Sequence, residues 1–272
     1  MNATADTIWE VPAYLPYLQP PLTEDAVATA ESKIGYKLPI EYLDLLRKQN
    51  GGYIRFSLPE LVHRAIAGIG PYYPTLTEFD WDECQEYVSF PLLGLIPFDG
   101  DGHWHLCLDY RHDALTPSIT FADVECDEET HIADSFAHYL TMLQIDIDGQ
   151  FVLEGVSDIE KVIAEFSSSL QIVFDPPDVW AHGYPTYRAN LAKTDAPEWL
   201  WISPNTVPRG FVRPDHPRFT DLKDLVPGLA PRFPELPSRS FIVSTTIGAR
   251  SRVIDACAKS RMILRPLSDY VK

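Results

Sequence analysis

The sequence predicts an α+β fold in which N-terminal helices, an antiparallel sheet and a closing helix form one domain, and a second, smaller α+β domain follows. Apolar residues recur at helical spacing before residue 50 and again after residue 134, with strand-like segments between them. Another succession of helical and strand-like segments starts near residue 149. Helices that flank a run of strands are typical of the α+β class.

The distribution of charge also separates two parts of the chain. Residues 1–150 carry 7 Lys+Arg and 25 Asp+Glu, whereas residues 151–272 carry 15 Lys+Arg and 14 Asp+Glu. A chain of 272 residues is long enough for two domains of roughly 150 residues each. We therefore expect a lead-in segment over residues 1–22, a first domain over residues 23–148 and a C-terminal domain of unknown role over residues 149–272.

Two helices are predicted at the start of the first domain. Thr23 is a favourable N-cap followed by two acidic residues, and Gly35 ends the apolar helical pattern. Pro39 suits the first position of the second helix, which ends at residues 50–52, an Asn-Gly-Gly sequence. Asn and Gly tolerate the left-handed backbone conformation that ends many helices.

Strand-like segments follow these helices. Residues 101–110 alternate, with Trp104 and Leu106 on one face and His105 and Cys107 on the other, which predicts a half-buried strand. Residues 99–102 read as a turn before it. Further strands are expected at residues 53–57, 92–96 and 118–121, and a closing helix begins at Asp134 or Ser135.

The second domain is predicted to open with a helix. Ser157 and Glu160 form a capping box before apolar residues at helical spacing. Its other expected elements are strands at residues 171–174, 199–202, 241–245 and 262–264 and a helix at about residues 249–259.

One motif resembles a known family. Residues 34–52 read IGYKLPIEYLDLLRKQNGG, which is similar to the opening signature of domains of the SUKH superfamily. Weaker matches to the family follow in the expected order up to the closing helix. The resemblance covers about residues 23–143, and its motif residues are Leu38, Pro39, Tyr42, Asn50, Gly51, Gly52, Asp109 and Phe136.

The SUKH resemblance implies an α+β fold and a protein-binding role. The superfamily includes a fungal regulator of cell-wall synthesis and bacterial immunity proteins, many of which neutralise nuclease or deaminase toxins. It implies no catalytic residues, and it says nothing about residues 151–272.

The acidic composition favours a basic protein partner. The formal net charge is −17 and the sequence pI is about 4.7. Such a surface repels nucleic acid, whereas it attracts a basic protein. Two acidic clusters are candidate partner-binding sites: Asp80, Asp82, Glu83 and Glu86, and Glu125, Asp127, Glu128 and Glu129. The sequence does not choose between them, and solvated acidic faces that serve only solubility are the alternative.

Aromatic and basic residues are dense in the second domain. Large aromatic side chains form cores, but together with Arg they also dominate pockets and binding hot spots. The residues of this candidate pocket are Trp180, His182, Tyr184, Trp199, Trp201, Asn205, Arg209 and Arg213.

No pattern in the sequence indicates an enzyme, a cofactor or a metal. The four cysteines form no C-x-x-C pair, and His103, His105 and Cys107 on one strand face suit two metal ligands better than three. No Gly-x-Ser-x-Gly, P-loop or dinucleotide motif occurs. The first residues lack the basic and apolar regions of a signal peptide, so we expect a cytoplasmic protein.

The sequence thus leaves three functional hypotheses. The first is an immunity-type protein that neutralises a basic, nuclease-like toxin by occlusion. The second is a cytosolic scaffold or regulatory module with other protein partners. The third is a small-molecule-binding protein that uses the aromatic C-terminal domain. The oligomeric state and the identity of the partner stay open.

Overall fold

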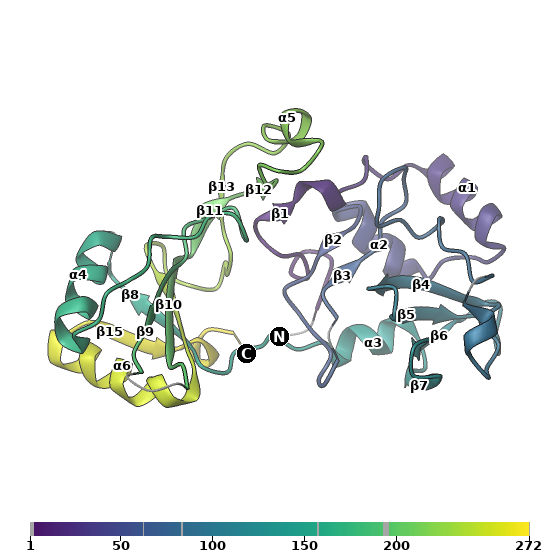
Figure 1. Cartoon of the computed structure of the whole chain (residues 1–272). Coiled ribbons are helices and arrows are strands. Elements are labelled where there is room, and N and C mark those ends of the chain that lie inside the picture. The colour runs from purple at the N-terminus through teal and green to yellow at the C-terminus, as the bar shows by residue number, and fades with distance from the viewer. Residues whose placement is uncertain (1–2, 62, 83, 157, 193–195, 272) are drawn as a thin grey trace. The chain divides into compact units, whose positions relative to one another are not determined.

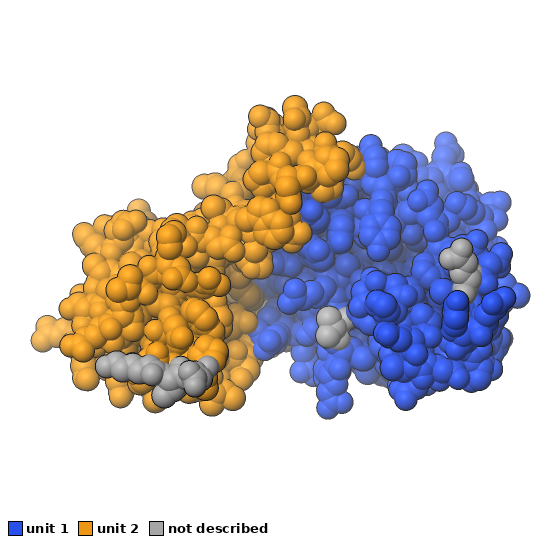
Figure 2. Space-filling view, viewed as in Figure 1, with its two compact units in different colours: residues 1–146 blue, residues 147–272 orange. Residues whose placement is uncertain are grey.

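The computed structural model describes residues 3–61, 63–82, 84–156, 158–192 and 196–271, and it confirms the α+β class. The chain divides into two compact units, Met1–Asp146 and Ile147–Lys272 (Figure 2). The first unit thus ends two residues before the boundary expected from the sequence. Each unit encloses its own cluster of buried apolar side chains.

Three helices of unit 1 follow the predicted signals closely. Helix α1 (Glu24–Ile34) starts after Thr23, whose Oγ1 accepts a hydrogen bond from the Ala26 N–H at 3.2 Å. It ends at Gly35, whose φ is 82°. Helix α2 (Ile40–Lys48) follows Pro39, and α3 (Phe136–Met142) is capped by Ser135 rather than Asp134, with the His138 N–H at 3.1 Å from the Ser135 Oγ.

A four-stranded antiparallel sheet forms the centre of unit 1 (Figure 1). Its strands lie in chain order: β4 (Leu95–Gly100), β5 (Trp104–Asp109), β6 (Ser118–Asp123) and β7 (Glu128–Ala133). The short strands β2 (Gly52–Tyr53) and β3 (Ala65–Ile66) pair with each other, and the Ala67 N–H bonds to the Phe98 carbonyl of β4 at 2.8 Å. The remaining short elements are β1 (Ala13–Tyr14) and the 3₁₀ helices η1 (Leu15–Tyr17) and η2 (Gln85–Tyr87).

The prediction that β5 is half-buried is wrong, because both faces of this strand are covered. His105 and Asp109 are only 3% and 2% exposed, and Cys107 is fully buried. Residues 79–82 and 84–92 form the cover: their apolar side chains pack over Cys107 and the neighbouring strand β6. An irregular segment has no periodic pattern, so the sequence did not reveal it.

Unit 2 contains a five-stranded antiparallel sheet with helices packed against it (Figure 1). The strand order is β15 (Ile263–Pro266), β8 (Gln150–Glu154), β14 (Phe241–Thr245), β10 (Trp199–Pro204) and β9 (Tyr187–Asn190). Helices α4 (Ile159–Leu170) and α6 (Ile247–Ser260) pack against each other and share a core with the sheet. Smaller elements are β11 (Thr206–Pro208), β12 (Gly210–Phe211), α5 (Phe219–Leu222), β13 (Leu229–Pro231) and η3 (Leu267–Asp269).

Two details of unit 2 differ from expectation. The observed cap of α4 is Asp158, whose Oδ1 accepts from the Glu160 N–H at 3.1 Å, while Ser157 lies outside the described residues. The strand expected at residues 171–174 is absent, because Gln171 takes a left-handed conformation with φ 54° and the following residues are irregular. Among the described residues, no helix has both the length and the apolar character needed to cross a membrane.

Candidate functional site

The motif residues that carry the SUKH resemblance hold the fold of unit 1 together. The side-chain amide of Asn50, which is 5% exposed, donates to the carbonyls of Pro20 at 2.6 Å and Ile69 at 2.9 Å. Its Oδ1 accepts from the Ile69 N–H at 2.8 Å. A Cβ added at Gly51 would lie 2.7 Å from the Gly68 nitrogen, so this turn requires glycine. Asn50 and Gly51 therefore tie the end of α2 to a distant loop.

The remaining motif residues are also structural. Tyr42 is fully buried and donates from its hydroxyl to the Ala67 carbonyl at 2.5 Å, while Leu38 and Phe136 lie in the core. Burial alone raises the pKa of Asp109, but hydrogen bonds from Arg111 and from Thr120 outweigh it and lower this pKa. Gly52, the residue after Gly51, lies in β2 with a φ of 133°, and Pro39 directly precedes α2. None of these residues forms an exposed chemical group.

The structure brings the two predicted acidic clusters onto neighbouring segments of unit 1. Asp127 accepts a hydrogen bond from the Ser89 N–H at 2.6 Å, which ties the turn between β6 and β7 to the segment after η2. Val88 and Val124 pack against the same apolar cluster. We call the exposed carboxylates of both clusters the acidic surface. Its residues are Asp80, Asp82, Glu86, Glu125, Asp127, Glu128 and Glu129, and Glu83 lies outside the described residues.

Only part of the acidic surface is neutralised by neighbouring cations. The Arg111 guanidinium bridges Asp109 and Glu129, with a distance of 2.7 Å from Nη2 to each carboxylate. The Nδ1 of exposed His103, which pairs as a cation only when the ring is protonated, lies 3.3 Å from the Glu125 carboxylate. In the described ranges, no ion pair involves the other five carboxylates of this surface. The acidic surface thus keeps a negative field toward solvent.

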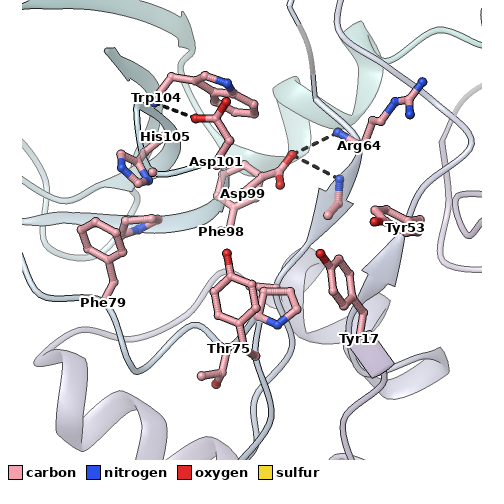
Figure 3. Close-up of a pocket in the computed structure, with 17 residues that line it drawn as sticks. Tyr17, Tyr53, Arg64, Thr75, Phe79, Phe98, Asp99, Asp101, Trp104 and His105 are labelled. Carbon is pink, nitrogen blue, oxygen red and sulfur yellow. Dashed lines mark hydrogen bonds between the residues drawn. The ribbon is translucent and has the colours of Figure 1, made fainter. Parts of the chain in front are cut away.

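A cavity of about 340 Å³ opens in unit 1 beside these segments (Figure 3). One wall consists of three tyrosines from separate segments: the ring of Tyr17 lies 4.9 Å from that of Tyr53 and 6.4 Å from that of Tyr73. Phe79 and Trp104 belong to the lining as well. This volume is at the lower end of the range for small-ligand pockets. Sequence reasoning missed this site, because its tyrosines come from three short, separate segments without a common motif: η1, β2 and the loop that contains Tyr73.

Asp99 of β4 supplies a carboxylate to the cavity and is held firmly. Its Oδ2 accepts from His63 Nδ1 at 2.6 Å and from the backbone N–H groups of Arg64 at 3.0 Å and Ala65 at 3.2 Å. Burial raises the pKa of Tyr139, so its hydroxyl keeps its proton, and this hydroxyl forms a hydrogen bond with His63 Nε2. All the described bonds to the Asp99 carboxylate use Oδ2, and Figure 3 shows its other oxygen turned toward the cavity.

Asp101 adds a second carboxylate at the turn between β4 and β5. Its Oδ1 accepts from the N–H groups of His103 at 2.9 Å and Trp104 at 3.2 Å. Burial acts to raise the pKa of Asp101, but these hydrogen bonds outweigh it, so the pKa is lowered and the group stays ionised. The pKa of Tyr73 is raised, first by burial and then by the charges of Tyr17, Asp99 and Asp101. Both carboxylates therefore act electrostatically on Tyr73, one of the three tyrosines of the wall.

His105 closes the cavity from the β5 side. Its ring packs edge-to-face against Phe79 at 4.6 Å and Trp81 at 5.1 Å between centroids. Burial lowers the pKa of His105, so the imidazole is neutral at pH 7. In the described structure, its buried Nε2 makes no hydrogen bond. Within the described residues, no three His, Cys, Asp or Glu side chains are arranged to hold a metal ion.

The candidate pocket residues of unit 2 fall into several contact groups. Arg213 stacks over Trp180 at 4.4 Å, and the Trp180 indole donates to Asp215 at 3.2 Å. His182 stacks on Tyr184 with ring centroids 5.6 Å apart. These residues lie in turns and loops of the stretch between α4 and β14, outside its strands and its helix α5.

Other members of that candidate set lie on strands or hold turns. Trp199 and Trp201 alternate with core residues along β10, and their rings are 6.1 Å apart. Asn205 is buried and bonds to the backbone of Phe233 through both side-chain atoms, at 3.0 and 2.9 Å. The Arg209 backbone N–H bonds to the Gly228 carbonyl at 3.0 Å. The role of this set as a pocket stays a prediction.

Comparison with known proteins agrees with the motif. Residues 21–142 match the model of the SMI1 / KNR4 family (SUKH-1). No curated protein matches the chain. The matched region contains the acidic surface and every cavity residue named above except Tyr17, and it ends at Met142, the last residue of α3. The resemblance to the SUKH superfamily is therefore confirmed over residues 21–142, which are just under half of the chain.

Proposed function

We propose that this protein is an immunity-type protein that binds a basic, nuclease-like toxin through unit 1 and neutralises it by occlusion. The match of residues 21–142 to the SMI1 / KNR4 family is consistent with an immunity-type or regulatory protein-binding role. The observation that carries the finer proposal is the acidic surface, in which two clusters distant in sequence lie on adjoining segments.

The acidic surface suits fast capture of a basic partner. Nucleases bind a polyanion and therefore expose positive charge. Complementary fields raise association rates by roughly 10- to 1000-fold at low salt. This gain fades when the Debye length falls from about 10 Å at 0.1 M salt to about 3 Å at 1 M. Occlusion needs no bond to be made or broken, so the proposal requires no catalytic residue.

Charge reversal of the acidic surface tests the proposal. One variant changes Asp80, Asp82 and Glu86 to Lys, and a second changes Glu125, Asp127 and Glu128 to Lys. Glu129 is left unchanged because it pairs with Arg111. We expect either variant to bind a nuclease toxin that the wild-type chain captures about tenfold more slowly at low salt, with a smaller effect at 0.5 M. Stopped-flow fluorescence measures the rate.

A matched control carries the same change of charge on unit 2. Glu160, Glu165 and Asp255 are exposed there, and their reversal to Lys should leave the association rate nearly unchanged. Equal slowing by all three variants would mean that only net charge matters. Unchanged rates in both unit 1 variants would contradict the proposal.

The regulatory alternative predicts different partners. If the protein is a scaffold, affinity capture with the full chain returns the same housekeeping proteins repeatedly and no nuclease. Affinity capture is then repeated with the charge-reversal variants of unit 1. Loss of those partners from the captured proteins would locate the regulatory contact on the acidic surface.

A further inference from the structure

We infer that the cavity of unit 1 binds a guanidinium or ammonium group, carried on an Arg or Lys side chain of the protein partner. This inference rests on the proposed function, since it names the contact that would anchor a basic partner. It is carried by the juxtaposition of a tyrosine wall with the carboxylates of Asp99 and Asp101.

The aromatic lining suits a cation. A guanidinium or ammonium group within about 6 Å of an aromatic centroid is attracted to the face of the ring. Tyr17, Tyr53 and Tyr73 form a continuous wall on one side, and Phe79 and Trp104 belong to the same lining. Tyr73 is 72% exposed and Phe79 38% exposed, so a side chain from outside can reach them.

The carboxylates provide the charge that a purely apolar pocket lacks. His63 and two backbone N–H groups hold Oδ2 of Asp99 and leave the other oxygen facing the cavity (Figure 3). Asp101 is ionised, and its Oδ1 accepts the backbone hydrogen bonds of the turn. A guanidinium has five donors in a planar fork, which matches two carboxylates in one cavity.

The one cation of the lining does not cancel these charges. Arg64 is exposed, and Figure 3 shows its guanidinium turned away from Asp99, to which it donates only through its backbone N–H. No ion pair of Arg64 with Asp99 or Asp101 occurs in the described structure. An anionic ligand would therefore meet two carboxylates, and a neutral ligand would leave both unpaired.

The cavity adjoins the acidic surface. Phe79 of the lining precedes Asp80 of that surface, and Gly102 precedes His103, which lies 3.3 Å from Glu125. A basic partner drawn to the acidic surface thus arrives beside the cavity. Arg side chains inserted into such pockets are typical interface hot spots.

A peptide titration tests this chemistry without the partner. The probe is Gly-Gly-Arg-Gly-Gly, acetylated and amidated, and its control contains citrulline, which has nearly the same shape but no charge. We expect the arginine peptide to shift the NMR signals of the Trp104 indole N–H and the Gly100 and Gly102 amides of the full chain. The citrulline peptide should bind at least about threefold more weakly.

Matched variants locate the binding site. Asp101→Asn keeps an oxygen to accept the turn hydrogen bonds, and Tyr73→Ala removes an exposed ring. Each should weaken the arginine peptide by about threefold or more. The control is Asp113→Asn, because Asp113 holds a turn of the same geometry outside the cavity, with the Leu115 and Thr116 N–H groups at 2.8 and 3.3 Å. It should bind the probe like the wild type.

Several outcomes would overturn the inference. Equal binding of arginine and citrulline peptides would make the cavity a site for neutral ligands. Equal effects of Asp101→Asn and Asp113→Asn would place the peptide elsewhere. Free arginine or putrescine that binds much more tightly than the blocked peptide would identify a small-molecule site. Toxin capture that is unaffected by Asp101→Asn and Tyr73→Ala would reject this anchor and leave the proposed function intact. If the cavity binds the arginine peptide but no toxin partner is found, the cation site stands and the proposed immunity function fails.

Discussion

At the scale of single residues, the polar side chains of Asn50 and Asp99 in unit 1 are paired with segments far away in the sequence. Asn50 joins the end of α2 to Pro20 and Ile69, and Asp99 joins β4 to residues 63–65. A buried polar group that loses its partner costs roughly 1–3 kcal/mol, so such side chains stabilise one arrangement of the chain. The left-handed turn at Gly51 depends on the same contacts.

Substitution of Gly51 tests this structural role. Gly51→Ala should lower the free energy of unfolding by roughly 1–3 kcal/mol, because its φ is 88° and a Cβ would meet the Gly68 nitrogen at 2.7 Å. Gly35→Ala is the matched control, with φ 82° but no atom within 4 Å of the new Cβ. It should cost less, since only backbone strain remains. Urea unfolding of the full chain measures both, and equal losses would rule out the clash.

The buried imidazole of His105 predicts a pH dependence. Burial lowers its pKa in the folded protein below the ordinary value of 6.5, so near and below that pH the unfolded chain binds more protons than the folded one. The contribution of His105 to the free energy of unfolding is therefore fully present above pH 6.5. It is lost as the pH falls toward the pKa of His105 in the folded protein.

The matching measurement compares unfolding free energies at pH 7.5 and pH 5.5. His105→Gln should show a smaller loss on acidification than the wild type, while His112→Gln, at an exposed position, should lose as much as the wild type. The comparison with the wild type cancels the contribution of Asp109, whose lowered pKa acts in the same direction. Identical pH profiles for all three proteins would show that His105 is not shielded from solvent.

At the scale of elements, the segment over residues 79–82 and 84–92 behaves as a cover for β5. Trp81 donates from its indole to the Leu95 carbonyl at 2.8 Å. Gln85 bonds to the Phe90 carbonyl at 3.0 Å and accepts from the Leu92 N–H at 2.9 Å, so one side chain closes the loop on itself. Because this segment also contributes to the acidic surface and to the cavity, its order matters for both.

Alkylation of Cys107 reports on this cover. Cys107 is fully buried beneath it, and burial raises the pKa of its thiol, whereas Cys126 is exposed. Gln85→Ala removes two hydrogen bonds and should speed the reaction of Cys107 with iodoacetamide by roughly 5- to 100-fold through local opening. Cys126 in the same sample is the internal control. Acceleration at both cysteines, or at neither, would contradict a cover held by Gln85.

The longer helices were predictable from sequence because their signals are local, whereas the four-residue helix α5 was not predicted. Thr23 and Gly35 mark the ends of α1 in both the sequence and the structure, and β14 was predicted with its observed bounds. Strand β8 was missed, since Gln150–Glu154 directly follows the turn that marked the expected domain boundary. The strand expected at residues 171–174 failed because four residues of apolar and polar character do not specify a pairing partner.

The cavity, unlike the longer helices, could not be predicted from sequence, because its residues share no local pattern. Tyr17 lies in η1, Tyr53 lies in β2, which pairs with β3, and Tyr73 lies in a loop, so only the tertiary fold brings their rings together. Asp99 and Asp101 appeared in the sequence as parts of one turn, but Asp99 belongs to β4, where a bulge between Pro97 and Asp99 shifts the register. Long-range pairing of this kind leaves no trace in residue spacing.

At the scale of the whole molecule, composition and packing both divide the chain. The apolar core of unit 1 draws on residues between Ala3 and Leu143, and that of unit 2 draws on residues between Phe151 and Cys257. The excess of acidic residues belongs to the first half of the sequence. The two parts of the proposed mechanism, the acidic surface and the cavity, both lie in unit 1.

We therefore predict that a fragment ending at Asp146 folds alone and binds the arginine peptide as the full chain does. The cut belongs after Asp146, because the next residues are tied to unit 2: the Asp148 carboxylate lies 3.0 Å from the Arg250 guanidinium, and the Gly149 carbonyl accepts from the Thr245 N–H at 2.9 Å. A domain of about 150 residues buries enough apolar surface for cooperative folding. Circular dichroism and thermal unfolding measure the fold, and NMR titration measures the binding. An unfolded fragment would show that unit 1 needs residues 147–272, while a folded fragment without peptide binding would assign unit 2 a part in the cation site.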